Sequence, residues 1–215
     1  MPLSRLNKEQ YAAATSTDPQ NLIIASAGTG KTSTIVGRIG YLISTGIKPE
    51  EILLLTFTNK AAHEMVERVA EYFGKDVASK IDAGTFHAVS YRWLKKQDKK
   101  VVLKQQRELK TLFRSVHEKR SFTHIEAEVT PYGGNYLYDV YSFYQNTELE
   151  SDFENWIVEK YEEHEQFALI YADIVDEFEA LKNEDGFVNF NDLLLNFRKI
   201  CQTKVLGYKE VLVDD

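Results

Sequence analysis

The sequence predicts an α/β fold built on a parallel sheet and interrupted by a helical insertion. Short apolar runs alternate with amphipathic stretches over residues 1–96 and again over 186–215, which is the rhythm of strands and helices around a parallel sheet. A glycine-rich loop, Ala25–Thr32, follows one apolar run and precedes a helical stretch. From about 97 to 185 the alternation stops, and apolar residues recur at helical spacing. We therefore expect a discontinuous domain, 1–96 and 186–215, around a helical insertion subdomain at 97–185.

Each element of the alternating part has a local reason. The apolar runs predicted as strands are Asn21–Ile24, Glu51–Phe57, Ile81–Phe86 and Lys209–Val213. The stretches predicted as helices are Asn7–Ala14, Ser33–Ile43, Asn59–Phe73, His87–Lys96 and a last one starting at Phe190. Asn7 is a favourable N-cap for the first helix, and Gly74 is a favourable stop for the third.

The aromatic residues of the insertion recur at helical spacing between Trp156 and Leu181. This stripe has two interpretations, the core of a helical unit or a surface on which bases stack. We favour the core, because a stripe at this spacing is the usual signature of a packed helix face.

Composition describes an ordinary soluble globular protein, with 43% hydrophobic and 27% charged residues in 215. The single cysteine, Cys201, excludes a disulfide framework and indicates a reducing compartment; we expect its thiol to be buried or half-buried. No apolar run reaches the roughly 18 residues of a membrane helix, and residues 1–5 lack the apolar core of a signal peptide. The expected location is the cytoplasm, with no membrane partner.

Positive charge is concentrated in residues 92–120, which hold eleven Lys and Arg residues against Asp98, Glu108 and Glu118. Residues 121–192 then hold 18 acidic residues. The net charge of −7 argues against a generally basic nucleic-acid binder. Two interpretations of the gradient stay open: a phosphate-facing surface beside a solvated one, or helices whose charges pair with each other.

The loop Ala25–Thr32 has the layout that binds nucleotide phosphates. Backbone N–H groups of such a loop converge on phosphate oxygens, and the following helix adds the partial positive charge of its N-terminus. Lys31 is predicted to reach the β- and γ-phosphates, and the hydroxyl of Thr32 to bind Mg²⁺. The general pattern begins with glycine, whereas this loop begins with Ala25.

A carboxylate that holds Mg²⁺ is expected at the end of a neighbouring strand, and Asp214 and Asp215 follow the last apolar run. Asp214 is predicted to hold the metal, directly or through water. Asp215 is predicted to orient or deprotonate the attacking water. The alternative is an acidic terminus without a catalytic role.

Taken together, the motifs resemble the UvrD/Rep-like superfamily 1 DNA helicases, including the RecB-type branch. The matching segments are Leu6–Gln10, Ala25–Thr32, Thr56–Met65, Ala83–Ala88 and Val211–Asp215. Members of this family commonly carry alanine at the first loop position, so Ala25 does not depart from their pattern.

The resemblance implies a RecA-like phosphate-loop domain that uses ATP and Mg²⁺. Gln10 stands where the family reads adenine, and an amide suits this role because it donates and accepts at once. The implied nucleotide-binding residues are Gln10, Ala27, Gly28, Thr29, Gly30, Lys31, Thr32 and Ser33. The implied metal ligands are Thr32 and Asp214, and the implied catalytic residues are Lys31, Asp214 and Asp215.

The resemblance also implies contacts with single-stranded DNA at two motifs. In the first, Phe57 offers a stacking face, while Thr58 and Asn59 offer small donors to phosphates at a helix N-terminus. In the second, Thr85 and His87 are the candidates. Core packing is the alternative for the aromatic residues, and we favour it for Phe86 but not for Phe57.

Four positions depart from the family's pattern. Ser33 stands where members of the UvrD/Rep branch often have an arginine that stacks on adenine. Asp215 stands where the family usually has glutamate, whose side chain is one methylene longer. In the segment that resembles the element Asp-Phe-Asp-Asp-Leu-Leu, two acids are replaced by Asn189 and Asn191, so a charge-dependent role there is in doubt.

The resemblance implies a DNA helicase that translocates on single-stranded DNA, meets duplex DNA at a junction, and serves DNA repair and recombination. Its complete motor needs a second RecA-like domain, whose arginines stabilise phosphoryl transfer. Because the sequence stops within the magnesium motif, we expect an N-terminal portion that binds nucleotide with little hydrolysis and no unwinding. One alternative is a non-catalytic, nucleotide-dependent DNA-binding or regulatory module. Another is a small-molecule kinase, which has no need of the DNA motifs.

Overall fold

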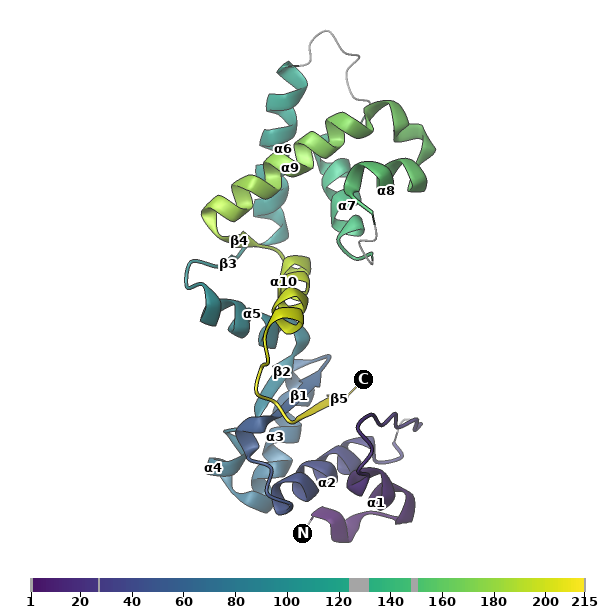
Figure 1. The fold of residues 1–215 in the computed structure, drawn as a ribbon, viewed down its shortest axis with the longest axis vertical. Helices are drawn as coiled ribbons and strands as arrows, with labels where there is room; N and C mark the ends of the chain where they lie inside the picture. Colours follow the sequence, from purple (N-terminus) through teal and green to yellow (C-terminus); the bar gives the residue numbers. More distant parts are fainter. Residues whose placement is uncertain (1, 27, 124–131, 148–150, 215) are drawn as a thin grey trace. The chain divides into compact units, whose positions relative to one another are not determined.

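The computed structural model describes residues 2–26, 28–123, 132–147 and 151–214 (Figure 1). Its contacts divide the chain into two compact units. The first is Met1–Arg92 with Ile200–Asp215, and the second is Trp93–Lys199. The division predicted from sequence, at residues 97 and 185, stays a prediction.

The first unit contains a three-stranded parallel sheet in the order β2–β1–β5. Its strands are β1 (Ile52–Thr56), β2 (Asp82–Thr85) and β5 (Glu210–Asp214). Its helices are the 3-10 turns η1 (Pro2–Arg5) and η2 (Pro49–Glu51), with α1 (Lys8–Thr15), α2 (Lys31–Ser44), α3 (Asn59–Phe73), α4 (Lys75–Ala78) and most of α5 (Phe86–Gln97). Mixed α/β content with a parallel sheet agrees with the fold class expected from the sequence.

The central strand β1 is buried along its whole length. Ile52 and Leu54 point to one face, where they pack against apolar residues of α2 and α3. Leu53 and Leu55 alternate with them and are also buried. A parallel strand covered on both faces is expected to be a continuous apolar run, which is why residues 52–55 are Ile-Leu-Leu-Leu.

The register of the sheet brings three strand ends to one level. Thr56 at the end of β1 pairs with Thr85 of β2 on one side and with Asp214 of β5 on the other. Ligands of open α/β sheets bind at the carboxyl ends of the strands. This edge therefore brings together three of the predicted motifs, those that contain Thr56, Thr85 and Asp214.

The strand predicted at Asn21–Ile24 is not formed, so that prediction is wrong. The segment has no strand assignment, and Leu22 and Ile24 are 87% and 89% exposed. Among the described residues, the sheet ends at β5, whose one strand partner is β1. An apolar run becomes a strand only when an edge takes up its backbone groups, and here no edge does.

The predicted helix ends are confirmed. The side chain of Asn7 accepts a hydrogen bond from the N–H of Gln10 at 2.8 Å, and the side chain of Gln10 accepts one from the N–H of Asn7 at 3.0 Å. Helix α3 ends at Gly74, whose φ of +84° is a conformation that favours glycine.

The second unit is mainly helical, with one short parallel pair of strands. Its elements are the end of α5, β3 (Val102–Leu103), α6 (Gln106–Thr123), α7 (Gly134–Tyr144), α8 (Phe153–Lys160), the 3-10 turn η3 (Glu162–Phe167), α9 (Ala168–Asp185), β4 (Phe187–Val188) and most of α10 (Phe190–Thr203). Tyr171, Ile174 and Phe178 of α9 are fully buried among residues of α6, α7 and α8. This confirms the interpretation of the aromatic stripe as core.

One further expectation is tested by exposure. Cys201 is exposed near the end of α10, so the expected burial of its thiol is wrong. Among the described residues, no helix combines the length and the apolarity that a membrane crossing requires.

Candidate nucleotide and nucleic-acid site

The phosphate loop is shaped by two glycines with left-handed backbone conformations. Gly28 has a φ of +79° and Gly30 a φ of +92°, which other residues adopt only at a cost. Between them, Thr29 donates to the carbonyl oxygen of Ser26 through its N–H at 3.3 Å and through its hydroxyl at 2.6 Å. Ala27, also predicted in this site, lies outside the described residues.

Helix α2 begins at Lys31 with Gly30 as its N-cap, and glycine has no side chain to cap the first N–H groups. The hydroxyl of Thr34 donates to the carbonyl oxygen of Gly30 at 3.1 Å. Lys31 and Thr32 are half-buried, and Ser33 is exposed. The first N–H groups of a helix have no partner within the helix. This end of a 14-residue helix, with a lysine at its first position, is suited to an anion.

Gln10 joins helix α1 to the phosphate loop. Its Nε2 donates to the carbonyl oxygen of Thr29 at 2.9 Å, while its Oε1 accepts from the N–H of Asn7. A side chain predicted to read the base therefore touches the loop predicted to hold the phosphates. The contact also explains Gly30, because a Cβ there would lie 2.6 Å from Nε2 of Gln10.

Lys31 and Asp214 line one cavity of about 860 Å³ that lies against β5 and the segment 19–25. Arg38 and Glu210 also line it and form an ion pair with 2.9 Å between Nη2 and Oε1. The guanidinium of Arg38 donates to the carbonyl oxygen of Ser16 as well. The cavity is therefore lined by the ion pair of Arg38 and Glu210 as well as by Lys31 and Asp214.

The residues predicted to hold Mg²⁺ are of the right chemical type. Magnesium takes oxygen ligands, and proteins bind it through one or two carboxylates together with substrate phosphates. Within the described part of the chain, no group of three or more His, Cys, Asp or Glu side chains gathers as a metal cage. The hydroxyl of Thr32 and the carboxylate of Asp214, together with substrate phosphates, fit this way of binding Mg²⁺. Asp215 lies outside the described residues, so its role stays a prediction.

The first predicted DNA motif lies where β1 passes into α3. Phe57 is 68% exposed. Thr58 is the N-cap of α3, and its hydroxyl oxygen accepts from the N–H of Ala61 at 3.1 Å. Asn59 is exposed in the first turn. The hydroxyl of Thr56 donates to the carbonyl oxygen of Thr58 at 2.8 Å and stabilises the turn between β1 and α3.

The second predicted DNA motif lies at the neighbouring strand end. The hydroxyl oxygen of Thr85 accepts from the N–H of Ala88 at 3.2 Å, and His87 is half-buried in the first turn of α5. Phe86 meets Phe57 edge to face, with 6.1 Å between ring centroids and 63° between the planes. The more buried ring of Phe86 thus holds the exposed ring of Phe57 in place.

One structural role at the start of β2 was not foreseen from the sequence. Arg92 of α5 forms an ion pair with Asp82 and donates to the carbonyl oxygen of Ala83 at 3.1 Å. Its guanidinium would lie 3.2 Å from a Cβ at Gly84, so the glycine makes room for it. Tyr208, just before β5, also donates to Asp82. A glycine inside a predicted strand was the only available signal.

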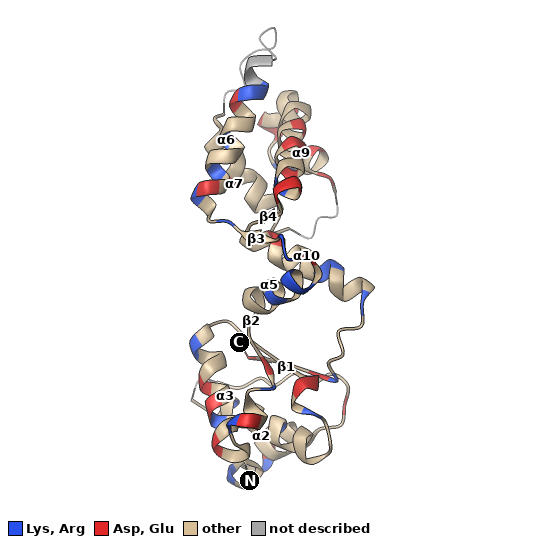
Figure 2. Cartoon of the chain, turned by 90° about the vertical axis from the view of Figure 1, so that its left-hand side faces the viewer, with Lys and Arg blue, Asp and Glu red and all other residues tan. Residues whose placement is uncertain are grey.

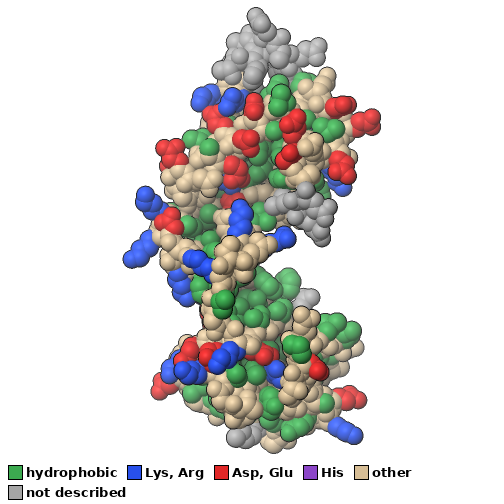
Figure 3. Space-filling model, viewed as in Figure 1, with side chains coloured by type: hydrophobic (Ala, Val, Ile, Leu, Met, Phe, Trp, Pro, Cys, Tyr) green, Lys and Arg blue, Asp and Glu red, His purple; other side chains and the backbone are tan. Residues whose placement is uncertain are grey.

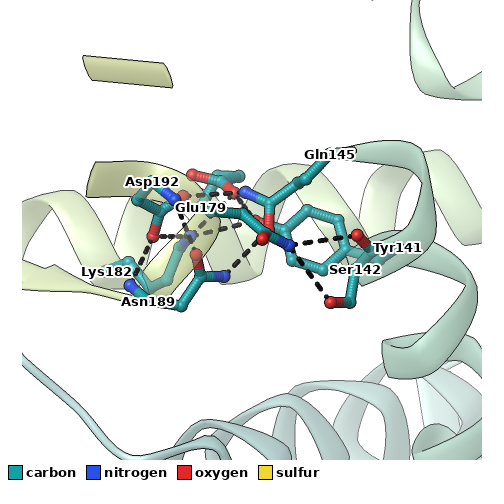
Figure 4. Close-up of polar contacts among 8 residues, drawn as sticks. Tyr141, Ser142, Gln145, Glu179, Lys182, Asn189 and Asp192 are labelled. Atoms are coloured by element: carbon teal, nitrogen blue, oxygen red, sulfur yellow. Dashed lines mark hydrogen bonds and ion pairs between the residues drawn. The ribbon is translucent and has the colours of Figure 1, made fainter. Parts of the chain in front are cut away.

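In the second unit, the segment with the two asparagines forms a buried polar network (Figure 4). Asn189 Nδ2 donates to Gln145 at 2.8 Å, and the Oδ1 of Asn189 accepts from the N–H of Asp192 at 2.7 Å. Asn191 Nδ2 donates to the carbonyl oxygen of Ser142 at 3.1 Å. Both asparagines therefore donate hydrogen bonds through their side-chain amide groups.

Several curated proteins are similar to part of this chain. An ATP-dependent DNA helicase srs2 of Schizosaccharomyces pombe is 38% identical over 102 residues, which is 47% of this chain and 12% of that protein. An ATP-dependent DNA helicase PcrA of Leuconostoc citreum is 41% identical over 99 residues, or 46% of this chain and 13% of that protein. A putative ATP-dependent DNA helicase YjcD of Bacillus subtilis is 43% identical over 96 residues, again 13% of that protein.

These matches cover less than a fifth of each relative's length, so they describe only a part of those proteins. The UvrD/REP helicase N-terminal domain family, in contrast, matches residues 6–215. Since this match takes in nearly the whole sequence, the chain belongs to the UvrD/REP helicase N-terminal domain family.

Proposed function

We propose that this chain is the ATP-binding part of an ATP-dependent DNA helicase that translocates on single-stranded DNA. The observation that carries the proposal is that Lys31 and Asp214, from opposite ends of the sequence, line one cavity. The glycine conformations of the loop and the uncapped start of α2 support phosphate binding at Lys31. With bound phosphates, Mg²⁺ would be held by Thr32 and Asp214, and it would neutralise charge on the transferred phosphoryl group.

The proposed DNA surface is the carboxyl edge of the sheet. Phe57 supplies an exposed ring on which a base can stack, and Thr58 and Asn59 supply donors at the N-terminus of α3. Thr85 and His87 stand at the neighbouring strand end. Because Thr56 pairs with both Thr85 and Asp214, a strand of DNA on this edge would lie close to the proposed metal ligand.

Nucleotide binding is tested by titrating Mg·ATP into the wild-type chain and a Lys31→Ala variant. Loss of a charge-assisted phosphate contact of about 1.5–3 kcal/mol should weaken binding by roughly 10- to 100-fold. Lys80→Ala, which removes an exposed lysine elsewhere in the first unit, is the matched control and should bind like wild type. Equal affinity in the wild type and Lys31→Ala would refute the assigned phosphate site.

DNA binding is tested by measuring single-strand affinity over a salt series. Phe57→Ala should lose about 1–3 kcal/mol of stacking with no change in salt slope, because a ring neutralises no phosphate. Tyr11→Ala, which removes another half-exposed ring of the same unit, is the control. A changed slope with unchanged affinity at high salt would contradict a stacking role.

For residues 1–215 alone we propose nucleotide binding with little hydrolysis. Arginine fingers contribute factors of about 10³–10⁵ to phosphoryl-transfer rates, and in the proposed motor they come from the second RecA-like domain. ATP-driven unwinding by these residues alone would overturn this part of the proposal.

A further inference from the structure

Ion pairs neutralise most of the basic charge of α6 in the second unit (Figure 2). Lys110 pairs with Asp139 of α7 at 2.6 Å, and Lys119 pairs with Glu177 of α9 at 3.0 Å. For α6, pairing of charge between helices is therefore the interpretation of the basic segment that holds.

In the first unit, the ion pair of Arg38 and Glu210 joins the two elements that carry Lys31 and Asp214. Arg38 lies on α2, and its Nε (3.0 Å) and Nη2 (2.9 Å) both contact Oε1 of Glu210 on β5. The two side chains are 12% and 23% exposed. Figure 3 shows acidic and basic side chains gathered in the part of the first unit where Figure 1 draws β5. The pair is thus a largely buried link between the helix of the phosphate loop and the strand of the proposed metal ligand.

The residues of α2 that line the cavity lie on one face of the helix. They are Lys31, Ile35 and Arg38, at the spacing of i, i+4 and i+7 that places side chains above one another along a helix. Seven residues of helix (38 − 31) span about 10.5 Å. Arg38 therefore stands two turns away from Lys31 along this face.

The residues of β5 alternate between two environments. Glu210, Leu212 and Asp214 are half-buried, whereas Val211 and Val213 are exposed. Leu212 packs against core residues of α2, α3 and β1. This face of β5 therefore looks toward α2, with Glu210 at one end of it and Asp214 at the other.

The two faces match in length. Four residues of strand (214 − 210) span about 13 Å, which is close to the distance along α2 from Lys31 to Arg38. When Glu210 is held by Arg38, Asp214 therefore comes to the level of Lys31, and both line the same cavity.

Arg38 also ties α1 to this arrangement. Its Nη1 donates to the carbonyl oxygen of Ser16 and lies 3.4 Å from that of Ala14, at the end of α1, where the last carbonyls have no partner within the helix. Helix α1 carries Gln10, which donates to the phosphate loop at Thr29. One guanidinium thus joins the three elements that carry the proposed base-reading, phosphate-binding and metal-binding residues.

The pair gives β5 a register that its backbone specifies weakly. Among the described residues, β1 is the one strand that pairs with β5, so no second neighbour fixes its position along the sheet. A slip of two residues keeps the same face inward, but it would put Leu212 beside Arg38 and move Asp214 by about 7 Å. The guanidinium, whose side chain is 12% exposed, would then lose its carboxylate, which is costly for a charge removed from water.

We infer that Arg38 and Glu210 are positioning residues for the proposed magnesium site, and that their ion pair holds Asp214 at the level of Lys31. The inference rests on the proposed function, in which Asp214 holds Mg²⁺ at nucleotide phosphates. Neither residue of the pair touches the nucleotide in this role. The pair should therefore matter for the contribution of Mg²⁺ to nucleotide binding, and not for the contact of the phosphate loop with the nucleotide.

The test compares ATP binding in Mg²⁺ with ATP binding in excess EDTA. The dissociation constant in EDTA divided by that in Mg²⁺ gives the magnesium enhancement. Asp214→Asn, which weakens the proposed ligand itself, sets the scale. Glu210→Gln keeps the size of the side chain and removes its charge, and it should lower the enhancement by about 10-fold, the low end for groups that orient a metal ligand. Its ATP affinity in EDTA should equal that of wild type.

Glu51→Gln is the matched control. Glu51 pairs with Lys209, the neighbour of Glu210, at 3.0 Å, so the same chemical change removes an ion pair at the same end of β5 without involving α2. This variant should keep the wild-type enhancement. Arg38→Lys, which keeps the charge, should retain more of the enhancement than Arg38→Met, which removes it.

Equal losses of affinity in Mg²⁺ and in EDTA would show a purely structural role for the pair and would overturn the inference. If Asp214→Asn loses the enhancement while Glu210→Gln keeps it, the inference fails and the proposed function stands. If Lys31→Ala binds ATP as tightly as wild type, or Asp214→Asn keeps the full enhancement, the proposed function fails and the inference fails with it. Circular dichroism verifies the fold of each variant, and where one substitution at the pair does not fold, the other decides.

Discussion

Lys182 and Asp192 form a buried ion pair, with 2.8 Å between Nζ and Oδ2 (Figure 4). The ammonium also lies 2.9 Å from the hydroxyl of Tyr141 and 3.0 Å from Glu179. The carboxylate of Asp192 accepts in addition from Gln145 at 2.7 Å and from the N–H of Asn189 at 2.8 Å. The pair therefore ties the start of α10 to α7 and α9, and the single ammonium of Lys182 is shared by the carboxylates of Asp192 and Glu179.

Removing one partner of this pair should destabilise the second unit strongly. Lys182→Met leaves the carboxylate of Asp192 buried without its cation, which costs about 3–5 kcal/mol. The double variant Lys182→Met/Asp192→Leu should recover much of the loss, since an apolar replacement of both partners is often neutral. Denaturant unfolding followed by the fluorescence of Trp156, which lies in the same unit, measures both. Equal stability of Lys182→Met and wild type would contradict the burial of this charge.

Stability of the second unit should fall in acid because of His164. Its side chain is fully buried, and its ring meets those of Tyr132, Tyr136, Tyr161 and Tyr171. Burial lowers the pKa of His164 from 6.5, while the charge of Glu163 opposes the shift. The folded state then binds fewer protons than the unfolded state, so its contribution is present above pH 6.5 and is lost as pH falls through the lowered pKa. Thermal unfolding from pH 7.5 to 5 measures it, and His164→Phe should flatten the profile while the exposed His63→Gln does not.

Alkaline pH should lower the stability of the second unit by ionising its buried tyrosines. Burial, with help from Asp192 for Tyr138 and from neighbouring tyrosines for Tyr171, raises the pKa of both phenols to about 12. A raised folded-state pKa means stability that is complete below pH 10 and lost as pH rises through about 12. Ultraviolet absorption should show that Tyr138 and Tyr171 are still protonated at pH 10 and ionise only as the second unit unfolds. Titration of all twelve tyrosines near pH 10 in a folded chain would contradict this.

Gly30→Ala should weaken nucleotide binding. The methyl group would displace the side chain of Gln10 from Thr29, and the φ of +92° would strain the loop. Gly46→Ala is the control, because its φ of +96° carries a similar backbone cost of about 1–2 kcal/mol in open space. Both variants should lose stability, but only Gly30→Ala should raise the dissociation constant of Mg·ATP. A further Gln10→Ala change should relieve the steric part of the defect.

Thr58→Ala should destabilise the first unit by about 1 kcal/mol, because α3 loses its N-cap contact with the N–H of Ala61. Thr58→Ser keeps the hydroxyl and should retain most of the stability. Denaturant unfolding measures the two. If both variants lose single-strand affinity equally while only one loses stability, the methyl group of Thr58 rather than its hydroxyl contacts DNA.

Local sequence was sufficient for the elements whose signals are local. The strands β1, β2 and β5 and the helix ends at Asn7 and Gly74 follow from apolar runs, caps and a glycine stop. The run at Asn21–Ile24 carries the same local signal, yet whether it pairs depends on the free edge of β5, which lies far away in the sequence. Tertiary contacts decide whether such a run becomes a strand, and the local propensity of its residues carries no information about those contacts.

Some parts of the candidate site were likewise predictable from local sequence, and others were not. The loop around Gly30 and the cap at Thr58 were predictable, because their chemistry is written in neighbouring residues. The contact between Gln10 and Thr29 was not, since it joins two separate segments. Nothing near Lys182 marks it as buried, because a lysine within an acidic helix usually lies in solvent; only the packing of α7 and α10 against α9 reveals its partner.

The position of β5 in the sequence sets an order of events during synthesis. Lys31 precedes Asp214 by 183 residues (214 − 31), and β5 pairs with β1 only after the whole second unit has been made. At about 5–20 residues per second, the ribosome needs roughly 10–40 s to cover that distance. During that interval β1 has β2 beside it and no partner on its other side. A nascent chain therefore contains the residues of the loop Ala25–Thr32 long before Asp214, the proposed metal ligand, leaves the exit tunnel.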